Sequence, residues 1–342
     1  MKEFKFKDFF NKVLTGMSIG IVVALIPGAL LGELAKALNW DSVVHLTNIS
    51  TRLLPVIMGL TIAMQFKLTP IQSGTLAITT AIAAGGIVLV DGAIVLAGIG
   101  DVINAGLIAG LTVFIMLAIG DKLKAYTILV VPTLVITVVG SFGLFTLPYV
   151  SSITAAIGQL VSQFTSLSPV VAGILIAITF AVMIVSPVST AGVAMAISLT
   201  GVSSGAANIG ICAAGFGLAV SGYKANGFGT SIAHFLGSPK MQMANMIKKP
   251  KIMLPVIVNA AVSGAFAGIL SIQGTPASAG FGISGLIGPL NHFNIVGYDL
   301  KNLLIGLLGF VIIPVSMAII TDRIFNKHLK IVKSDDYKIN FN

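Results

Sequence analysis

Apolar segments long enough to cross a lipid bilayer recur along the whole chain. They lie at roughly 13–32, 70–90, 102–120, 125–147, 169–186, 252–272 and 302–320. A membrane-spanning helix needs about 20 predominantly apolar residues. Two further apolar regions are interrupted: 46–66 contains Arg52 and Pro55, and 187–222 contains a small and polar stretch at 199–208. The pattern predicts an all-α polytopic membrane protein with about ten transmembrane helices, some of them interrupted.

The composition excludes the competing classes. Charged residues make up 9% of the 342 residues and hydrophobic residues 56%, whereas soluble domains carry about 25% charged residues. So little charge could not cover a water-exposed surface, which rules out a soluble enzyme. The one cysteine, Cys212, rules out a disulfide or a Cys-based metal site, and no nucleotide or metal motif occurs. We expect no cofactor and no metal.

Lysines predict the topology. The net charge is +9, which in a membrane protein reflects basic cytoplasmic loops rather than a nucleic-acid partner. Lysines gather in the N-terminal residues, around Lys122, in a basic loop at 223–251 and in a basic tail at 322–342, while Trp40 and Asp91 fall between clusters. Both termini are therefore expected in the cytoplasm, within a single membrane domain of residues 1–342.

The segment 273–291 does not fit a plain loop. It is glycine-rich, half apolar and flanked by predicted spans. Non-helical backbone is tolerated at membrane depth only when it is buried in protein or lines a watery cavity. A re-entrant hairpin is the interpretation that we favour, and an ordinary extracellular loop is the alternative.

Uncharged polar side chains mark the candidate solute site. The substrate-binding candidates are Asn208, Asn259, Gln273, Thr275, Ser278, Ser284 and Asn291, with Asp101 and Asn104 as further polar contacts. Amides and hydroxyls both donate and accept hydrogen bonds, which suits a neutral sugar or polyol. The alternatives are helix-to-helix hydrogen bonds for the two Asn residues of the apolar segments, and a helix N-cap for Asp101. Between Lys122 and Leu300 the only carboxylate is Asp299, which argues against a proton relay there.

The basic loop at 223–251 is the candidate docking surface. It contains five lysines, no acid, and the glycine-rich stretch KANGFGTS, whose backbone N–H groups could face an anion. We expect Lys248, Lys249 and Lys251, with His234, to dock a cytoplasmic partner. The alternative is that the lysines only set the topology.

Three stretches carry a family resemblance. SPVSTAGVAMAISLTGVSSGAANIG, GSPKMQMANMIKKPKIMLPVIVNAAVSGAFAG and GTPASAGFGISGLIGPLN resemble membrane-spanning IIC components of the bacterial phosphotransferase system. The resemblance covers about residues 13–320 and includes the stand-alone branch of perfringolysin regulator-like proteins. It implies an EIIC-like fold of ten helices with re-entrant hairpins, a homodimer in the cell membrane, and elevator-like transport of a sugar that a separate IIB protein phosphorylates.

Two departures keep other functions open. Sugar-type relatives place a Glu near the second hairpin and a His in the substrate domain, whereas 273–291 has no Glu and His292 follows it. No IIA or IIB domain is fused, so any phosphoryl transfer would come from separate proteins. The leading prediction is an EIIC-type permease for a sugar or related small polar solute. The alternatives are a membrane sensor or regulator that has lost phosphoryl transfer, and a transporter that works without phosphorylation.

Overall fold

A computed structural model of the protein describes residues 6–339. Over this range the chain is almost wholly helical and its one sheet has two strands, which confirms the all-α class. The chain divides into two compact units. Unit 1 runs up to Gly28 and resumes over Asp41–Ile153, and unit 2 holds Ala29–Trp40 and the chain from Thr154 to the last described residue.

Unit 1 is built from helices and one hairpin. Its elements are α1 (Phe6–Ala37), α2 (Asp41–Arg52), α3 (Leu54–Gln65), α4 (Pro70–Ala84), β1 (Ile87–Val90), β2 (Ala93–Leu96), α5 (Val102–Ile119), η1 (Gly120–Tyr126), α6 (Thr127–Leu134), η2 (Val135–Val139) and α7 (Gly140–Phe164). The last turns of α1 and α7 belong to unit 2. Local signals explain α4: Thr69 and Gln72 form a capping box, and Gly85 ends the helix in the left-handed conformation.

Glycines let the helices of unit 1 approach closely. A Cβ added to Gly16 or Gly20 of α1 would collide with the backbone of α3. Gly59 of α3 faces the backbone of Ala77 in α4 in the same way. Close contacts of this kind between backbones are typical of helices packed in membranes.

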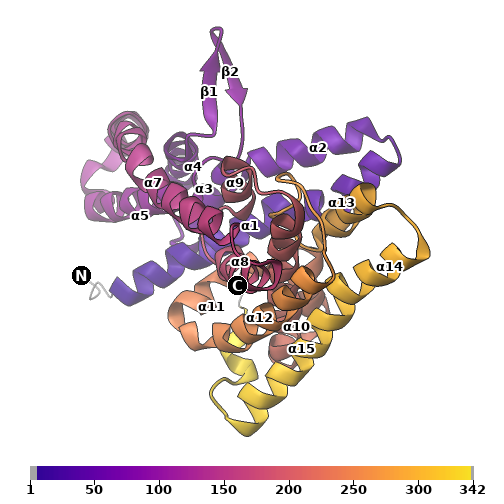
Figure 1. The fold of residues 1–342 in the computed structure, drawn as a ribbon. Helices are drawn as coiled ribbons and strands as arrows, with labels where there is room; N and C mark the ends of the chain where they lie inside the picture. Colours follow the sequence, from indigo (N-terminus) through magenta and orange to yellow (C-terminus); the bar gives the residue numbers. More distant parts are fainter. Residues whose placement is uncertain (1–5, 340–342) are drawn as a thin grey trace. The chain divides into compact units, whose positions relative to one another are not determined.

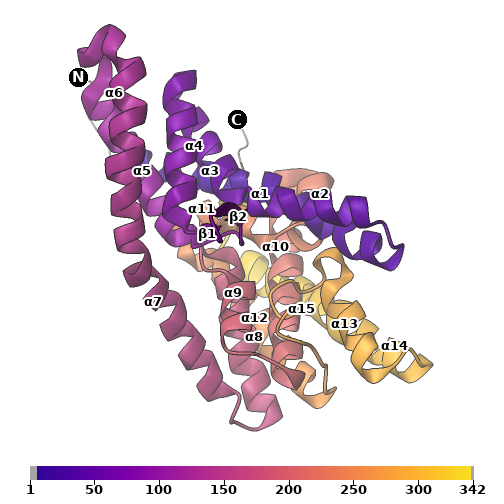
Figure 2. The ribbon, with the colours of Figure 1, turned by 90° about the horizontal axis from the view of Figure 1, so that it is seen from above.

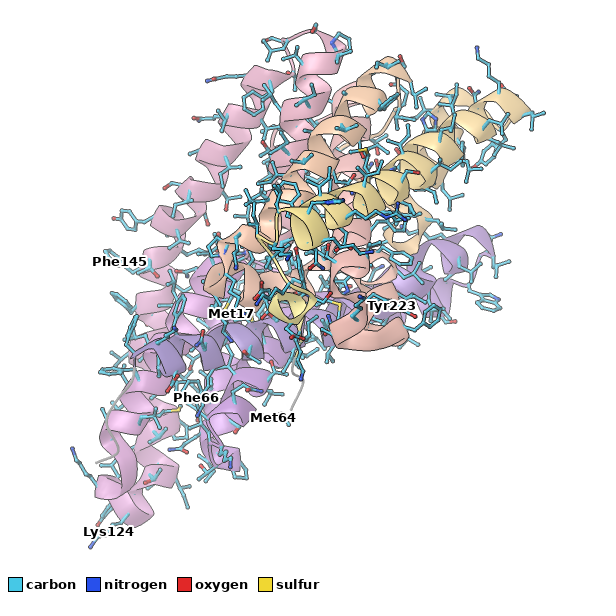
Figure 3. All side chains as sticks on the ribbon, turned by 90° about the horizontal axis from the view of Figure 1, so that it is seen from below. Met17, Met64, Phe66, Lys124, Phe145 and Tyr223 are labelled. Atoms are coloured by element: carbon cyan, nitrogen blue, oxygen red, sulfur yellow. The ribbon has the colours of Figure 1, made fainter. Side chains whose placement is uncertain are left out.

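The lysine-bearing ends of α1 and α3 lie together in unit 1. The ring centroid of Phe9 is 5.1 Å from that of Phe66, just after α3, and 6.5 Å from that of Phe114 in α5. Lys12 Nζ lies 5.4 Å from the centroid of the Phe66 ring, and Lys124 lies at the tip of the turn that follows α5 (Figure 3). This grouping agrees with the lysine pattern, and which side faces the cytoplasm stays a prediction.

The segment 70–90, expected as one span, is only partly helical. α4 ends at Ala84, and residues 87–96 form an antiparallel hairpin that projects from the end of α4 (Figure 1). Its turn is Asp91-Gly92, and both residues have positive φ, 50° and 80°. Asp-Gly between apolar runs is a strong hairpin signal. Here the turn that it forms prevails over the tendency of the apolar run to continue as a helix.

Unit 2 surrounds one central helix. Its elements are α8 (Pro169–Val185), α9 (Thr190–Ala196), α10 (Gly201–Leu236), η3 (Pro239–Gln242), α11 (Met243–Lys248), η4 (Pro250–Ile252), α12 (Met253–Ile269), η5 (Ser284–Leu286), α13 (Ile287–Val296), α14 (Leu300–Leu307), η6 (Leu308–Ile312), α15 (Ile313–Asp322), η7 (Arg323–His328) and η8 (Ser334–Tyr337). α10 packs against α8, α12 and α15, which lie side by side in Figure 2. Every residue from 204 to 219 of α10 is buried.

Small residues form the crossing of α8 and α12. A Cβ added to Gly173 of α8 would collide with the carbonyl of Gly264 in α12, and one added to Gly264 would collide with the carbonyl of Gly173. Gly268 faces the carbonyl of Pro169 in the same way. The high glycine content that the sequence shows is therefore used for helix contacts.

The helices confirm a multi-pass membrane protein. Among residues 6–339, six segments are long and apolar enough to cross a membrane, and a seventh arises if α2 and α3, bent by 52°, count as one span. α8 is apolar and shorter. The expected number of ten crossings stays a prediction.

The expected basic loop at 223–251 is largely helical. α10 continues to Leu236 with one break at Gly227, whose φ of 73° is outside the helical region. The break turns the chain back, since the rings of Phe216 and Phe235 lie 4.7 Å apart. KANGFGTS is therefore part of a helical hairpin, and the glycine-rich anion loop expected there is not formed. The link between α10 and α12 is residues 237–252.

Candidate functional site

The segment between α12 and α13 folds back onto the start of α10. Gly201 and Gly274 exchange two backbone hydrogen bonds, N–H to O distances 2.9 and 3.1 Å. Ser204 Oγ, one turn into α10, donates to the carbonyl of Thr275 at 2.8 Å. The segment contains turns rather than a helix until Ser284. Its backbone is thus held inside unit 2, as a re-entrant segment requires.

Asn208 of α10 holds the same segment at a second point. Its Oδ1 accepts from the backbone N–H of Gly282 at 3.0 Å, and its Nδ2 lies 3.4 Å from Ser278 Oγ. Ser278 Oγ also lies 3.0 Å from the backbone N of Thr275 and so closes a turn within the segment. Asn208 is fully buried, so its amide positions the segment and does not lie on an open surface.

The break before α10 meets the segment too. The chain leaves helical structure between α9 and α10 at residues 197–200, slightly earlier than the 199–208 predicted. Thr190 Oγ1 at the start of α9 donates to the carbonyl of Gly280 at 2.9 Å, and a Cβ on Gly280 would collide with the backbone of Ala191. Two helix breaks, far apart in sequence, are therefore adjacent in unit 2.

Two adjacent residues at the end of the segment have unsatisfied polar atoms. His292 Nδ1 accepts from the backbone N–H of Gln273 at 3.0 Å. In the neutral ring the proton is then on Nε2, which is buried and has no hydrogen-bond partner, and Asn291 Oδ1 is also buried and unpaired. Buried polar atoms without partners are rare and need an explanation. An unpaired acceptor and an unpaired donor are each what a hydroxyl group can satisfy.

Of the remaining polar residues of the segment, two are partly exposed and one forms structural hydrogen bonds. Gln273 is half-buried, and its Oε1 would lie 3.7 Å from a Cβ added to Gly201 at the start of α10. Thr275 is half-buried as well. Ser284 Oγ lies 3.1 and 2.9 Å from the carbonyls of Phe235 and Gly237, so it ties the segment to the far end of α10.

Asn259 lies elsewhere in unit 2 and is fully engaged. Its Nδ2 donates to the carbonyls of Ala213 in α10 and Pro314 in α15, at 3.2 and 3.0 Å, and its Oδ1 accepts from Ser263 at 2.9 Å. The residue is fully buried. This geometry fits the alternative interpretation, a hydrogen bond between helices, better than a solute contact.

Asp101 and Asn104 belong to unit 1, where they organise helix ends. Asp101 is the N-cap of α5 and accepts from the backbone N–H of Asn104 at 2.8 Å. Asn104 Nδ2 donates to the carbonyls of Ala83 and Gly143, and its Oδ1 accepts from Thr146. Both side chains form hydrogen bonds within the chain. For Asp101 this is the helix N-cap that was given as the alternative to a solute contact.

The basic residues expected to dock a partner fall into two groups. Lys248, Lys249 and Lys251 are exposed. His234 is fully buried: its Nδ1–H donates to the carbonyl of Thr230 at 2.8 Å, and its Nε2 accepts from Gln242 at 3.1 Å. His234 therefore cannot contact a partner protein directly and instead fixes Gln242.

Lys240 is a buried cation with no carboxylate among its bonded partners. Its Nζ donates to the carbonyls of Ser186 and Val188 at 2.6 and 2.7 Å, just beyond the end of α8. A third carbonyl, that of Met183 in the last turn of α8, lies 3.5 Å away, and the negative end of the helix dipole there favours an ammonium group. Burial lowers the pKa of Lys240 to about 7. The sequence gives no signal for this contact, because it joins residues more than fifty positions apart.

Within residues 6–339 no group of three or more His, Cys, Asp or Glu side chains is placed to hold a metal ion. The candidate solute site, formed by the segment 273–291, His292 and the start of α10, is uncharged. Its side chains are amides, hydroxyls and one imidazole, and they suit a neutral polar molecule better than an ion.

The comparisons with known proteins agree with the sequence resemblance. The sequence model of a family described as "Phosphotransferase system, EIIC" matches residues 11–339. The comparisons with curated proteins and with solved structures give no match.

Proposed function

Because the chain belongs to the phosphotransferase system EIIC family, we propose that it is a permease for an uncharged, hydroxyl-rich solute such as a sugar or a polyol. Membership of the family makes the chain a membrane component of such a transport system. The nature of the solute, the mode of movement and the partners are the parts that we add.

The observation that carries the proposal is that Asn291 and His292 each have a buried polar atom without a hydrogen-bond partner. Asn291 Oδ1 is an acceptor and His292 Nε2–H a donor, and both are buried without a partner. Leaving one such group unsatisfied costs about 1–3 kcal/mol. Solute hydroxyls that donate to Asn291 or accept from His292 would recover this cost, whereas a cation would meet the His292 N–H with the wrong polarity.

Transport requires the site to be presented to both sides of the membrane. The division of the chain into two compact units supports an elevator-like movement of one unit against the other. The two helix breaks that meet at α10 are the arrangement that transporters use at their binding sites. A homodimer, which the resemblance implies, is part of the same proposal.

Phosphorylation would come from separate IIA and IIB proteins. Cys212 is buried, so it is not placed to carry a phosphoryl group from a soluble donor. Lys248, Lys249 and Lys251 are exposed next to one another, and they offer a basic surface to a phosphorylated partner. Lysines attract such a group as point charges, so the attraction should weaken with salt.

The test is solute binding by purified protein in detergent, with neutral sugars and polyols as probes. The variants are N291L and H292F, and the matched control is N294L, since Asn294 is exposed and three positions along the same helix. We expect one probe to raise the melting temperature of the wild type and of N294L. The same probe should not change the melting temperatures of N291L and H292F. Equal stabilisation of all four proteins would place the site elsewhere.

A further inference from the structure

The C-terminal residues 332–339, called the tail segment below, fold back onto the link between α10 and α12. Val332 and Tyr337 in the tail segment are fully buried. Tyr337 donates its hydroxyl proton to the carbonyl of Ile252 at 3.2 Å, and a Cβ added to Gly222 of α10 would lie 3.1 Å from Tyr337 Cβ. The tail segment is therefore anchored by an aromatic side chain.

Three amide side chains hold the backbone of the tail segment. Asn226 and Gln242 donate to the carbonyl of Tyr337 at 2.8 and 2.7 Å, and Asn245 donates to the carbonyl of Lys338 at 2.9 Å. Asn226 also accepts from the backbone N–H of Ile339 at 2.8 Å. These contacts set the position of the segment without depending on its charges.

In that position Asp336 meets the exposed lysines. Its Oδ1 lies 2.6 Å from Lys249 Nζ and its Oδ2 lies 3.8 Å from Lys251 Nζ. The carboxylate is only 10% exposed, while the two lysine side chains remain about half exposed, at 49% and 50%. Burial alone would raise the pKa of Asp336, but hydrogen bonds from Lys249 and from the Lys333 N–H outweigh it, and the pKa is lowered.

We propose that Asp336 is an internal stand-in for the anionic group of a partner. The carboxylate of Asp336 occupies two of the three exposed lysines, Lys249 and Lys251, and a partner that carries a phosphoryl group displaces it. The inference rests on the docking role proposed above and adds a competitor encoded in the chain itself.

Competition raises the affinity that a partner needs in order to bind this surface. A phosphoryl group carries a charge of about −1.5 to −2 and three acceptor oxygens, whereas a carboxylate carries one charge and two oxygens. A partner with only ordinary acidic side chains gains little by exchanging one carboxylate for another. A phosphorylated partner gains charge and hydrogen bonds, so it can still bind after the tail segment has lowered the apparent affinity of both forms by the same factor.

The experiment uses the full chain in detergent and two readouts. The first is the rate at which Lys249 and Lys251 are acetylated by a small reagent, followed by mass spectrometry. The second is affinity for an acidic peptide that contains phosphoserine, and for its unphosphorylated twin. The variant is D336N, and the matched control is D335N, because Asp335 is the neighbouring carboxylate and is exposed.

We expect D336N to raise the acetylation rates and the affinity for both peptides about three- to fivefold, the size expected when one half-exposed ion pair is lost. The ratio of the two peptide affinities should stay as it is in the wild type, and D335N should behave as the wild type. K249Q should weaken peptide binding. Opposite effects of D336N and K249Q on peptide affinity separate competition from a structural role. If the ion pair were only structural, both substitutions would change the peptide affinity in the same direction.

The two proposals fail differently. If the wild type binds the phosphopeptide but acetylation and affinity are unchanged in D336N, the tail segment does not compete, and the docking surface stands. If D336N raises acetylation but no variant binds either peptide, the docking role itself is wrong, and with it the displacement of the tail.

Discussion

Asn208 in α10 accepts a hydrogen bond from the backbone N–H of Gly282, 74 residues further along the chain. The contact joins the central helix of unit 2 to the non-helical segment that precedes α13. Gly282 has a φ of 63° and its added Cβ would meet Ile211. The segment thus lies against α10 so closely that a side chain at position 282 would not fit. Its position depends on Asn208.

We expect Asn208→Leu to disorder the segment as well as to abolish solute binding. The variant leaves the buried N–H of Gly282 without an acceptor, which costs about 1–3 kcal/mol. The measurement is maleimide labelling of a cysteine placed at Ala277, which is exposed. Cys212 is buried, so the background is low. Faster labelling in Asn208→Leu is expected, and identical labelling with normal binding would show that the amide does not hold the segment.

Asn259→Leu should separate stability from binding. Asn259 donates to the carbonyls of Ala213 and Pro314, and those bonds join α12 to α10 and α15. Losing them should lower the free energy of unfolding by about 1–2 kcal/mol. Solute affinity should stay within twofold of the wild type at temperatures where the variant is folded. A loss of affinity with unchanged melting temperature would restore Asn259 to the solute site.

The sequence predicted the helical class and the family, and it favoured a re-entrant hairpin over an ordinary loop at 273–291. These features are local: apolar runs, glycine and polar breaks. The Asp91-Gly92 turn was also readable, but the apolar residues on both sides suggested a span. The helical structure on both sides of Gly227 was not predicted, because the glycines and lysines of 223–251 indicated a loop.

The contacts that define the site could not be predicted because they are long-range. Asn208 was selected as a solute ligand, yet its partner Gly282 comes from a segment whose path the sequence does not specify. His292 was noted only as the histidine nearest the segment. The bond from the Gln273 N–H to His292 Nδ1, which leaves Nε2 unpaired, exists only once the chain has folded back. The burial of His234 could not be predicted either, because the lysines around it in the sequence indicated an exposed loop.

Stability should increase with pH through the titration of Lys240. Burial lowers its pKa to about 7 in the folded protein, from an ordinary value of 10.5. Between these values the unfolded chain binds the proton and the folded chain does not, so the free energy of unfolding rises with pH, by about 1.4 kcal/mol per pH unit at most. The gain is lost as the pH falls through about 7.

The measurement is the melting temperature between pH 6 and pH 9 for the wild type, Lys240→Met and Lys224→Met. Lys224 is exposed, so its variant controls for the removal of one charge. The wild type and Lys224→Met should gain stability with pH, and Lys240→Met should lose that dependence. A dependence that survives in Lys240→Met must come from another group.

Gly264→Ala should disrupt the crossing of α8 and α12. Its Cβ would meet the carbonyl of Gly173 and the side chain of Ala177, and overpacking of this kind costs about 1–3 kcal/mol. Gly229→Ala is the matched control, since nothing lies within 4 Å of its added Cβ. Thermal unfolding in detergent should show a lower melting temperature for Gly264→Ala alone. Equal melting temperatures would mean that the two helices can move apart at no cost.

The central claim is that the chain moves a neutral, hydroxyl-rich solute through the site at Asn291 and His292. The direct measurement is exchange of labelled solutes across proteoliposomes that contain the purified protein, with neutral sugars, amino sugars and sugar acids compared in parallel. The account predicts exchange of a neutral sugar or polyol by the wild type and by Asn294→Leu, and none by His292→Phe. Exchange of charged solutes alone, or undiminished exchange by a correctly folded His292→Phe, would contradict it.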